Sequence, residues 1–328
     1  MKKVSVALTG AGGQIAYHLI YSISKGEVFG FDTQVDLRLV DIPEVLPKIE
    51  GLVMELEDSR LTLLSSVSIH SDQQLDQAFQ SIDFAFLVGA FPRLAGMERK
   101  DLLEKNGLIF KTQGEALGAY AKPSVQTLVV GNPCNTNCLI ALSHAKNIPS
   151  NQFYAMTLLD EFRASYQLAK MCQVPVVDIT DLYIYGNHSA TQFPDFTNAR
   201  VKDQPIISVL DQSGLETTFV PMIQQRGAAV IKARGSSSAA SAARSAAETA
   251  HKIWSQSSTP FSVAVVSSGC YDAPDGIVVS APYYFKDGKG RVYDRFDHDA
   301  TAKAMIEKSY QELLQEREAV IALGFLDE

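Results

Sequence analysis

The alternation of short apolar runs with longer helical patterns is the feature that most limits the fold of this chain. Asp83–Gly89 and Gln126–Val130 are apolar almost throughout, which is typical of strands buried on both faces of a parallel sheet. A long helix is predicted between them, from about Arg99 to Tyr120, and Val4–Leu8 is predicted to be the first strand. This order predicts an α/β fold, a doubly wound parallel sheet with helices on both faces. The other elements expected in this half are helices at Ile15–Ile23 and around Leu52–Leu56, and strands at Asp36–Val40, Val67–His70 and Phe153–Thr157.

The alternation ends near residue 150, and mixed strands, turns and long helices follow. A chain of 328 residues is long enough for about two domains. We therefore expect a first domain at 1–153 and a second domain, of mixed α+β type, at 154–328. Residues 234–251 are rich in Ala and Ser, but a helix is favoured over a linker because Ala is the best helix former and no Pro interrupts the run. The last elements expected are a hairpin turn at Asp287–Gly290 and an amphipathic helix over 299–322.

Composition excludes several classes of protein. The chain has 29 Lys and Arg against 37 Asp and Glu, a net charge of −8 without any basic block, which argues against general binding to nucleic acid or to an anionic membrane. Its four cysteines form no CxxC pair, so we expect reduced thiols. No run approaches the roughly 18 apolar residues of a spanning helix, and Thr9–Gly13 interrupts the apolar N-terminus too early for a signal peptide. We expect a soluble, cytoplasmic protein.

A glycine-rich loop follows the first predicted strand and opens a helix. Glycines are needed where the backbone turns tightly and where a pyrophosphate must approach N–H groups at a helix N-terminus. Asp41, at the end of the second predicted strand, would accept hydrogen bonds from the adenosine ribose and repel a 2′-phosphate, so the pattern favours NAD over NADP. A plain strand-to-helix turn and a surface aspartate are the alternatives. The loop reads Gly10-Ala11-Gly12-Gly13-Gln14-Ile15-Ala16.

Polar residues also follow two later strands, at the sheet edge where open α/β sheets bind ligands. Arg93 and Arg99 flank a loop that contains Gly96, a composition that suits a lid. Two solvated arginines would give the same pattern. Pro133 biases Asn132 away from the helical region, so the Asn132 amide could project toward a ligand, although a simple turn would also explain it.

Acid–base candidates lie beyond the predicted boundary. Asp160 and Arg163 are three residues apart and share one face of a predicted helix, as a surface ion pair also would. His188 stands in a Gly-Asn turn, and imidazole is the side chain best suited to exchange a proton near neutral pH. The other five histidines are expected to have no chemical role. In particular, the Phe296–Asp299 cluster around His298 is expected to be a solvated turn and not a metal site, and no metal is predicted elsewhere.

Taken together, these segments resemble the lactate and malate dehydrogenase family, and more closely its cytosolic-type malate dehydrogenases. The resemblance covers nearly the whole chain, and several motifs in the right order are more specific than any one of them. It implies a Rossmann domain followed by an α+β substrate domain, a homodimer, and a role in the tricarboxylic acid cycle. The motifs that carry it are Thr9-Gly10, Met54–Leu56, Gly96–Leu103, Gly131–Pro133, Gly186–Ser189 and Arg226–Ile231.

The resemblance also implies roles for individual residues. His188 matches the proton acceptor and Asp160 the carboxylate that stabilises its imidazolium, while Arg163 matches the arginine that grips the substrate C1 carboxylate. Arg99 would polarise the reacting carbonyl, and Asn132 would touch both substrate and cofactor. The positions implied to contact NAD are Gly10, Gly12, Gly13, Gln14, Ile15, Ala16, Asp41, Asn106, Gln113, Val130, Gly131 and Asn132.

Arg93 is implied to set the substrate. A dicarboxylate brings a second negative charge, which needs a positive partner once water is excluded. Malate dehydrogenases carry arginine at this place and lactate dehydrogenases usually an uncharged side chain, so malate and oxaloacetate are predicted. A dehydrogenase of another 2-hydroxy acid and a non-catalytic NAD-binding homologue are the alternatives.

The chain departs from the family around Asp160. Where related malate dehydrogenases commonly read Thr-Arg-Leu-Asp-His-Asn-Arg, this chain has Leu158, Glu161 and Phe162. Asp160 and Arg163 are retained, so the chemistry is expected to be retained too. The segment lies near the family's subunit contact, where details are expected to differ.

Overall fold

The chain folds into two compact units in a computed structural model that describes residues 1–91 and 99–327, with the side chains of residues 99 and 100 left out. Each unit is formed by segments that are separate in the sequence. Unit 1 comprises Met1–Ala155, Ala239–Ser255 and Glu316–Glu328, and unit 2 comprises Met156–Ser238 and Gln256–Gln315. The division of the chain at 153/154 stays a prediction about domains.

Unit 1 is built on six parallel strands in the order β6-β5-β4-β1-β2-β3. The strands are β1 Lys2–Thr9, β2 Thr33–Asp41, β3 Leu64–Ser71, β4 Phe84–Leu87, β5 Gln126–Val129 and β6 Phe153–Ala155. The order reverses between β1 and β4, which pair side by side, so their carboxyl ends form the switch point where such sheets bind ligands. The predicted parallel α/β sheet is confirmed.

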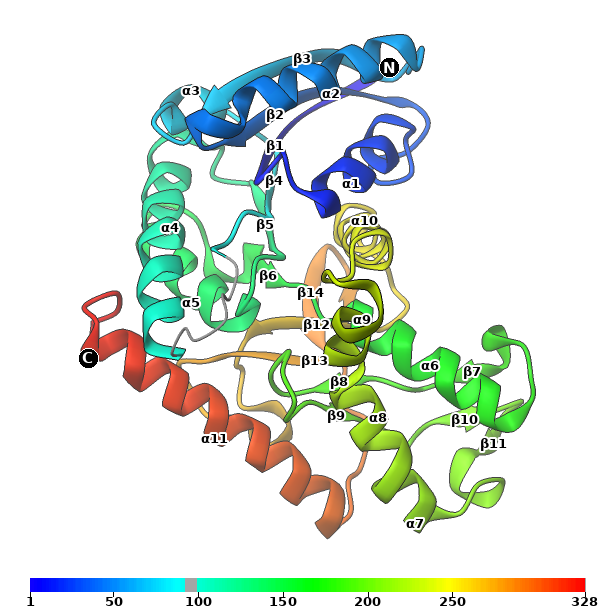
Figure 1. The fold of residues 1–328 in the computed structure, drawn as a ribbon. Coiled ribbons are helices and arrows are strands. Elements are labelled where there is room, and N and C mark those ends of the chain that lie inside the picture. Colours follow the sequence, from blue (N-terminus) through cyan, green and yellow to red (C-terminus); the bar gives the residue numbers. More distant parts are fainter. Residues whose placement is uncertain (92–98, 328) are drawn as a thin grey trace. The chain divides into compact units, whose positions relative to one another are not determined.

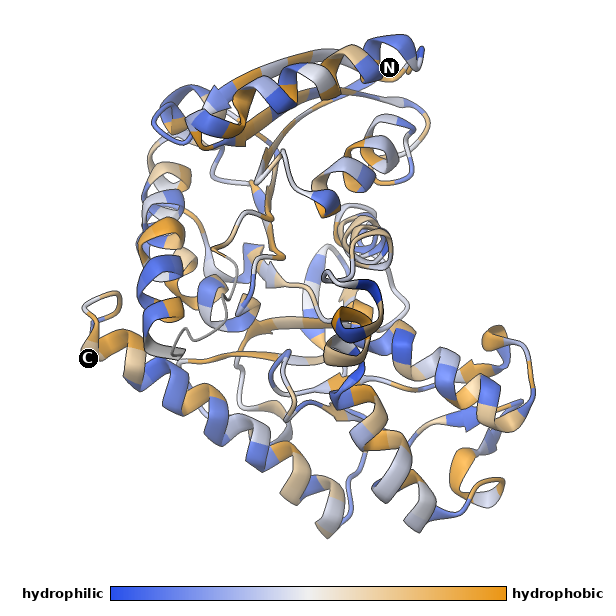
Figure 2. Ribbon diagram, in the orientation of Figure 1, coloured by the Kyte–Doolittle hydropathy of each residue, from blue (hydrophilic) through white to orange (hydrophobic). Residues whose placement is uncertain are grey.

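Helices cover both faces of this sheet (Figure 1), with α4 packed on α5 and α1 packed on α10. The helices of unit 1 are α1 Gln14–Ser24, α2 Leu46–Asp58, α3 Leu75–Ala78, α4 Arg99–Tyr120, α5 Cys134–His144 and α10 Ala240–Trp254, with short 3₁₀ turns η1 Pro43–Val45 and η2 Ser150–Gln152. β4, β5 and β6 are buried almost throughout and are rich in apolar residues, as strands covered on both faces are, whereas β3 is half-buried to exposed along its length (Figure 2).

The Ala- and Ser-rich stretch is helical over most of its length. The prediction of one helix over 234–251 is wrong at its start, because α9 ends at Arg234 before Gly235, whose φ of +75° stops the helix, and α10 begins at Ala240. Small side chains line the buried face of α10 and allow it to pack against α1 and β5. The imidazole Nδ1 of His251 hydrogen-bonds the Val28 carbonyl at 3.0 Å, so this distant segment is fastened to unit 1.

Unit 2 contains the antiparallel strands β12-β13-β14, a three-stranded sheet of short strands in the order β11-β10-β7, and the pair β8-β9. Its strands are β7 Ile179–Thr180, β8 Ile184–Tyr185, β9 Phe193–Pro194, β10 Arg200–Val201, β11 Gln204–Pro205, β12 Phe261–Val266, β13 Val278–Lys286 and β14 Lys289–Val292. The hairpin predicted at Asp287–Gly290 is confirmed, since Asp287 and Gly288 connect β13 to β14 with positive φ angles.

Helices of unit 2 surround an aromatic and aliphatic core. They are α6 Leu158–Cys172, α7 Gln212–Gly214, α8 Val220–Gln224, α9 Arg226–Arg234 and the part of α11 up to Gln315, with short turns η3 Val176–Asp178, η4 Ile206–Ser208, η5 Leu215–Phe219 and η6 Cys270–Asp272. The whole of α11 spans Ala300–Ala322, and its residues from Glu316 onward belong to unit 1. The predicted amphipathic C-terminal helix is confirmed as α11, in which Ala302, Ile306, Tyr310 and Leu313 are buried at helical spacing with exposed residues between them. Hydrophobic and hydrophilic residues both occur along it in Figure 2. Tyr185, Phe193, Phe219 and Tyr310 are among the core side chains with almost no exposed surface.

Candidate active site

The glycine-rich loop turns sharply at the switch point of the sheet in unit 1. Gly10 has a φ of +68°, and a Cβ built on it would lie 2.5 Å from the Cα of Gly89. The ends of β1 and β4 therefore approach each other more closely than any side chain at Gly10 would allow. The Ala11 N–H donates to the Val40 carbonyl at 3.2 Å, which fixes the loop beside the end of β2.

The start of α1 fits a pyrophosphate. Gly13 is the N-cap residue, so it offers no side chain to the N–H groups of the first helical turn, and both Gly13 and Gln14 are exposed. Uncapped N–H donors at a helix N-terminus, which carries partial positive charge, suit an anionic group. Ile15 is half-buried and Ala16 is fully buried, so these two hold the helix against the sheet.

Asp41 lies directly beside this loop. Its Oδ2 accepts a hydrogen bond of 2.9 Å from the Gly12 N–H, and its Oδ1 accepts one of 2.8 Å from the Ile42 N–H. Lys48 Nζ donates to the Gly12 carbonyl at 2.6 Å, a contact that was not predicted from the sequence. The carboxylate predicted to meet the ribose is thus held at the glycine loop, as an adenosine site would require.

The other predicted cofactor residues are divided between exposed and structural positions. Asn132, in a cis peptide bond with Pro133, is exposed, whereas Val130 and Gly131 are buried at the end of β5. Asn106 is fully buried, and its amide is bonded to the backbone of Phe91 and Leu102 at 2.8 to 3.3 Å. Asn106 therefore holds the segment before residue 92 in place, and its contact with NAD stays a prediction.

Gln113 is a second buried amide on α4, only 8% exposed. Its Oε1 has no hydrogen-bond partner among the residues described. Arg93 lies outside the described residues, and so does the side chain of Arg99.

Unit 2 brings Asp160, Arg163 and His188 together. Asp160 is fully buried in the first turn of α6, and its Oδ2 is hydrogen-bonded to Nδ1 of His188. Its Oδ1 accepts a hydrogen bond of 3.1 Å from Nη1 of Arg163, and Nη2 of Arg163 donates to Ser238 Oγ at 3.0 Å. The His188 side chain is 13% exposed and that of Arg163 is 14% exposed. A carboxylate on Nδ1 leaves proton exchange to the other ring nitrogen, Nε2.

The charges of this group favour an ionised Asp160. Burial of its carboxyl group acts to raise the pKa, but the charges of His188 and Arg163, with hydrogen bonds from His188 and Gln192, outweigh burial. The pKa of Asp160 is therefore lowered. A charged Asp160 can stabilise the imidazolium that forms when His188 accepts a proton.

The lowered pKa of Asp160 predicts how stability depends on pH. A carboxyl with a depressed folded pKa contributes stability that is present above the ordinary value near 4 and is lost as the pH falls through the lower, folded value. Asp160→Asn should therefore melt roughly 5 °C below wild type at pH 7, and the gap should narrow as the pH falls below about 4. Thermal melts of both proteins at several pH values measure this difference in melting temperature. Asp178→Asn, which removes a surface pairing to Lys202 at 4.0 Å, is the control and should change little. A gap that is independent of pH would contradict the prediction.

Ser280 of β13 is hydrogen-bonded both to the residue before α6 and to the segment before His188. Ser280 Oγ is hydrogen-bonded to Thr157 Oγ1 at 2.7 Å and donates to the Ile184 carbonyl at 2.8 Å. The backbone of Ser280 also exchanges two hydrogen bonds with that of Gly186. One serine thus connects the start of α6 to the segment before His188. Sequence reasoning missed Ser280, because nothing in the local pattern distinguishes it from other serines.

The residues that depart from the family pattern have structural roles. Leu158 is fully buried at the start of α6, and Phe162 is half-buried. Glu161 Oε2 accepts a hydrogen bond of 2.7 Å from the Ser262 N–H, which holds β12 against α6. These substitutions leave the contacts between Asp160, Arg163 and His188 in place.

A second histidine–aspartate pair corrects one expectation. The His298 side chain is only 3% exposed, and its Nε2 lies 3.0 Å from Oδ2 of the fully buried Asp195, so the expectation of a solvated turn is wrong for His298, although its neighbours Asp297 and Asp299 are exposed. The ring also makes edge-on contacts with the rings of Tyr185 and Tyr271, and Asp195 accepts further hydrogen bonds from Thr197 and Asn198. The aromatic packing and the shared aspartate make this a structural pair.

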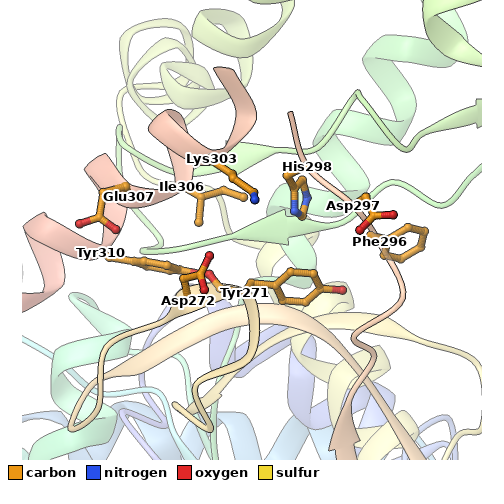
Figure 3. A pocket seen from close by; sticks show the side chains of 9 residues that line it. All are labelled: Tyr271, Asp272, Phe296, Asp297, His298, Lys303, Ile306, Glu307 and Tyr310. Carbon is orange, nitrogen blue, oxygen red and sulfur yellow. The ribbon is translucent and has the colours of Figure 1, made fainter. Parts of the chain in front are cut away.

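The His298 pair borders a small pocket of about 280 Å³ in unit 2. Figure 3 shows the rings of Tyr271 and Tyr310 on one side, with Lys303, Ile306 and His298 opposite them. Three carboxylates and one lysine lie among its lining residues, which are Tyr271, Asp272, Phe296, Asp297, His298, Lys303, Ile306, Glu307 and Tyr310. Asp160, Arg163 and His188 do not line this pocket.

The cysteines, the possible metal-binding groups and the helix lengths bear on the class of protein. The four cysteines are all free thiols. Within residues 1–91 and 99–327, no three His, Cys, Asp or Glu side chains are grouped so that they could hold a metal ion. Over the same part of the chain, no helix has both the length and the apolar character needed to cross a membrane.

Both halves of the chain match known protein domains. Residues 4–154 match the lactate/malate dehydrogenase NAD binding domain, and residues 157–323 match the lactate/malate dehydrogenase alpha/beta C-terminal domain. The glycine loop and the uncapped start of α1 therefore belong to an NAD binding domain, and the cofactor is NAD.

Solved structures with similar folds include enzymes of both kinds. A malate dehydrogenase from Naegleria fowleri is 39% identical, with a TM-score of 0.93 over 98% of this chain and 99% of its own. A lactate dehydrogenase from Trichomonas vaginalis, solved in complex with NADH and oxamate, is 35% identical, with a TM-score of 0.92 over 98% of each chain. A malate dehydrogenase from Plasmodium falciparum shares the fold at 20% identity, with a TM-score of 0.83 over 98% of this chain and 99% of its own.

Proposed function

Because the chain belongs to the lactate/malate dehydrogenase family, a family of NAD-dependent oxidoreductases, we propose that it interconverts (S)-malate and oxaloacetate. The observation that carries the chemistry is the pairing of His188 with the buried, ionised Asp160. The choice of malate rests on Arg93 and is supported by the 39% identity to a malate dehydrogenase. A lactate dehydrogenase at 35% identity makes the substrate the part of the proposal that most needs a test.

The proposed mechanism assigns each step to a side chain. When bound, NAD supplies the hydride acceptor for malate oxidation. Nε2 of neutral His188 takes the proton of the C2 hydroxyl, and Asp160 stabilises the imidazolium. Arg163 pairs with the C1 carboxylate through guanidinium donors that Asp160 and Ser238 do not use. In oxaloacetate reduction His188 starts protonated and returns that proton to the carbonyl oxygen.

The remaining substrate contacts come from the segments after β4 and β5. We assign the C4 carboxylate to Arg93, polarisation of the reacting carbonyl to Arg99, and a contact with substrate and cofactor to Asn132. Closure of the 91–100 segment as a lid would exclude water, which strengthens each of these charged contacts.

The direct test is NADH consumption by the purified protein with oxaloacetate and, in parallel, with pyruvate. We expect kcat/KM for oxaloacetate to exceed that for pyruvate by at least about 100-fold, because only oxaloacetate satisfies the charge of Arg93. A preference for pyruvate would exclude the malate assignment. Turnover of neither, with a panel of other 2-oxo acids also tried, would favour another substrate or a non-catalytic NAD-binding homologue.

We also propose that the enzyme is a cytoplasmic homodimer, as the family resemblance implies. Light scattering of the purified protein should then give twice the 35.8 kDa of one chain. A mass of one chain or of four would contradict the dimer.

A further inference from the structure

Glu312 of α11 is hydrogen-bonded to residues that come before and after His188 in the sequence. Its Oε2 accepts a hydrogen bond of 3.0 Å from Asn187 Nδ2 and one of 2.6 Å from Thr191 Oγ1, and Ser189 Oγ donates to the same oxygen. We propose that Glu312 is a positioning residue, which fixes the loop of residues 186–191, the histidine loop, so that the His188 ring stays aligned with Asp160. This inference rests on the proposed role of His188.

Ser309, three residues earlier on the same face of α11, completes the attachment. Its Oγ accepts a hydrogen bond of 2.8 Å from the Asn187 N–H and lies 3.0 Å from Thr191 Oγ1. Ser309 is fully buried, and a Cβ at Gly186, whose φ is +90°, would lie 2.1 Å from Ser309 Oγ. The histidine loop therefore lies against α11 at its first residue and is bonded to it at the residues before and after His188.

The chemistry of the contacts calls for a carboxylate at position 312. An amide nitrogen and two hydroxyl groups all donate to one oxygen, and an ionised carboxylate is an acceptor without any donor of its own. Hydrogen bonds to a charged acceptor are roughly twice as strong as neutral ones. Glutamine would keep the shape and one acceptor oxygen, but it would remove the charge that strengthens all three contacts.

The position of the loop matters because His188 has two simultaneous tasks. Nδ1 must stay on Asp160 while Nε2 meets the substrate hydroxyl, and both depend on the backbone that carries the ring. A displacement of about 1 Å in a reacting group can cost on the order of 100-fold in rate. The contacts of Glu312 described above are with residues on either side of His188 in the loop, so the proposed role is exerted through the position of the loop backbone.

The experiment changes the Glu312 carboxylate in one variant and its hydrogen-bond donors in the histidine loop in another. It thereby distinguishes an effect of loop position from an effect of the charge. Glu312→Gln removes the charge, whereas the double variant Ser189→Ala with Thr191→Val removes two donors and keeps the charge. Glu307→Gln is the matched control, since Glu307 is an exposed residue of α11 whose Oε1 accepts a hydrogen bond of 2.6 Å from Gln311 Nε2 on the same helix. For each protein, kcat, KM, the Kd of NADH, the melting temperature and the pH profile of malate oxidation are measured.

We expect Glu312→Gln and the double variant each to lower kcat by roughly 10-fold, with the Kd of NADH within about twofold of wild type. A loosened contact with Asp160 disfavours the imidazolium, so the acid limb of the pH profile should move to lower pH by about half a unit. Glu307→Gln should match wild type in all five measurements. If the acid limb of the pH profile moves in Glu312→Gln but not in the double variant, the lost charge of Glu312 accounts for the shift. The proposed positioning role is then overturned.

Unchanged kcat and pH profile in both folded variants would also overturn the inference. If the Glu312→Gln protein does not fold, the double variant tests the inference by itself, because it removes only neutral side-chain groups. His188→Gln, measured in parallel, keeps the two proposals distinguishable. If that variant retains turnover, the proposed role of His188 fails and the positioning role fails with it, whereas loss of turnover there with unchanged Glu312→Gln overturns the positioning role alone.

Discussion

Replacing His188 by glutamine is expected to lower kcat for malate oxidation by roughly 10³-fold, because glutamine cannot exchange a proton near neutral pH. The buried Asp160 keeps Arg163 as a partner, at 3.1 Å, so the variant does not leave an unpaired charge inside unit 2. The Kd of NADH should stay within about twofold, since the glycine loop and Asp41 belong to unit 1. Stopped-flow or steady-state kinetics with a fluorescence titration of NADH measures both quantities.

His298→Gln is the matched control for this prediction. Both histidines are paired with a fully buried aspartate, but aromatic rings pack against His298, and Asp195 has other donors. We expect His298→Gln to lower the melting temperature and to leave kcat, measured well below that temperature, within about threefold. A loss of turnover as large as that in His188→Gln would show that the two pairs are not functionally distinct.

The parts of the fold that the sequence predicted are those set by local periodicity and by burial on both faces. Two strands were predicted, at Asp83–Gly89 and Gln126–Val130, because a parallel strand buried on both faces has few polar residues. The helix between them, at Arg99–Tyr120, was predicted from its helical periodicity. The shared face of Asp160 and Arg163 was predictable for the same reason, since helical spacing alone brings residues three apart together.

Contacts between distant segments could not be predicted in this way. Ser280 and Glu312 lie more than 90 residues from the groups they hold near the active site, and serine and glutamate are common on surfaces. The burial of His298 was hidden by its acidic neighbours, which look like a solvated turn in the sequence. The two-residue strands β7 to β11 are too short to show an alternating pattern.

Changing Arg93 to leucine is expected to exchange the substrate preference. The C4 carboxylate of oxaloacetate would lose its only proposed cationic partner under a closed lid, and truncating one side of a desolvated charge pair costs about 2 to 5 kcal/mol. At about 1.4 kcal/mol per factor of ten, kcat/KM for oxaloacetate should fall by roughly 10³-fold. Pyruvate has a methyl group in place of that carboxylate, so its kcat/KM should rise or stay unchanged.

Arg99→Gln provides the contrasting variant, because its proposed partner is the reacting carbonyl that both substrates share. It should lower kcat/KM for oxaloacetate and pyruvate by similar factors, whereas Arg93→Leu should change the ratio of the two by at least about 100-fold. The ratio is informative because general damage to the segment after β4 would affect both substrates alike. If Arg93→Leu lowers both equally, the second carboxylate is recognised elsewhere, and Arg93 serves the reaction without choosing its substrate.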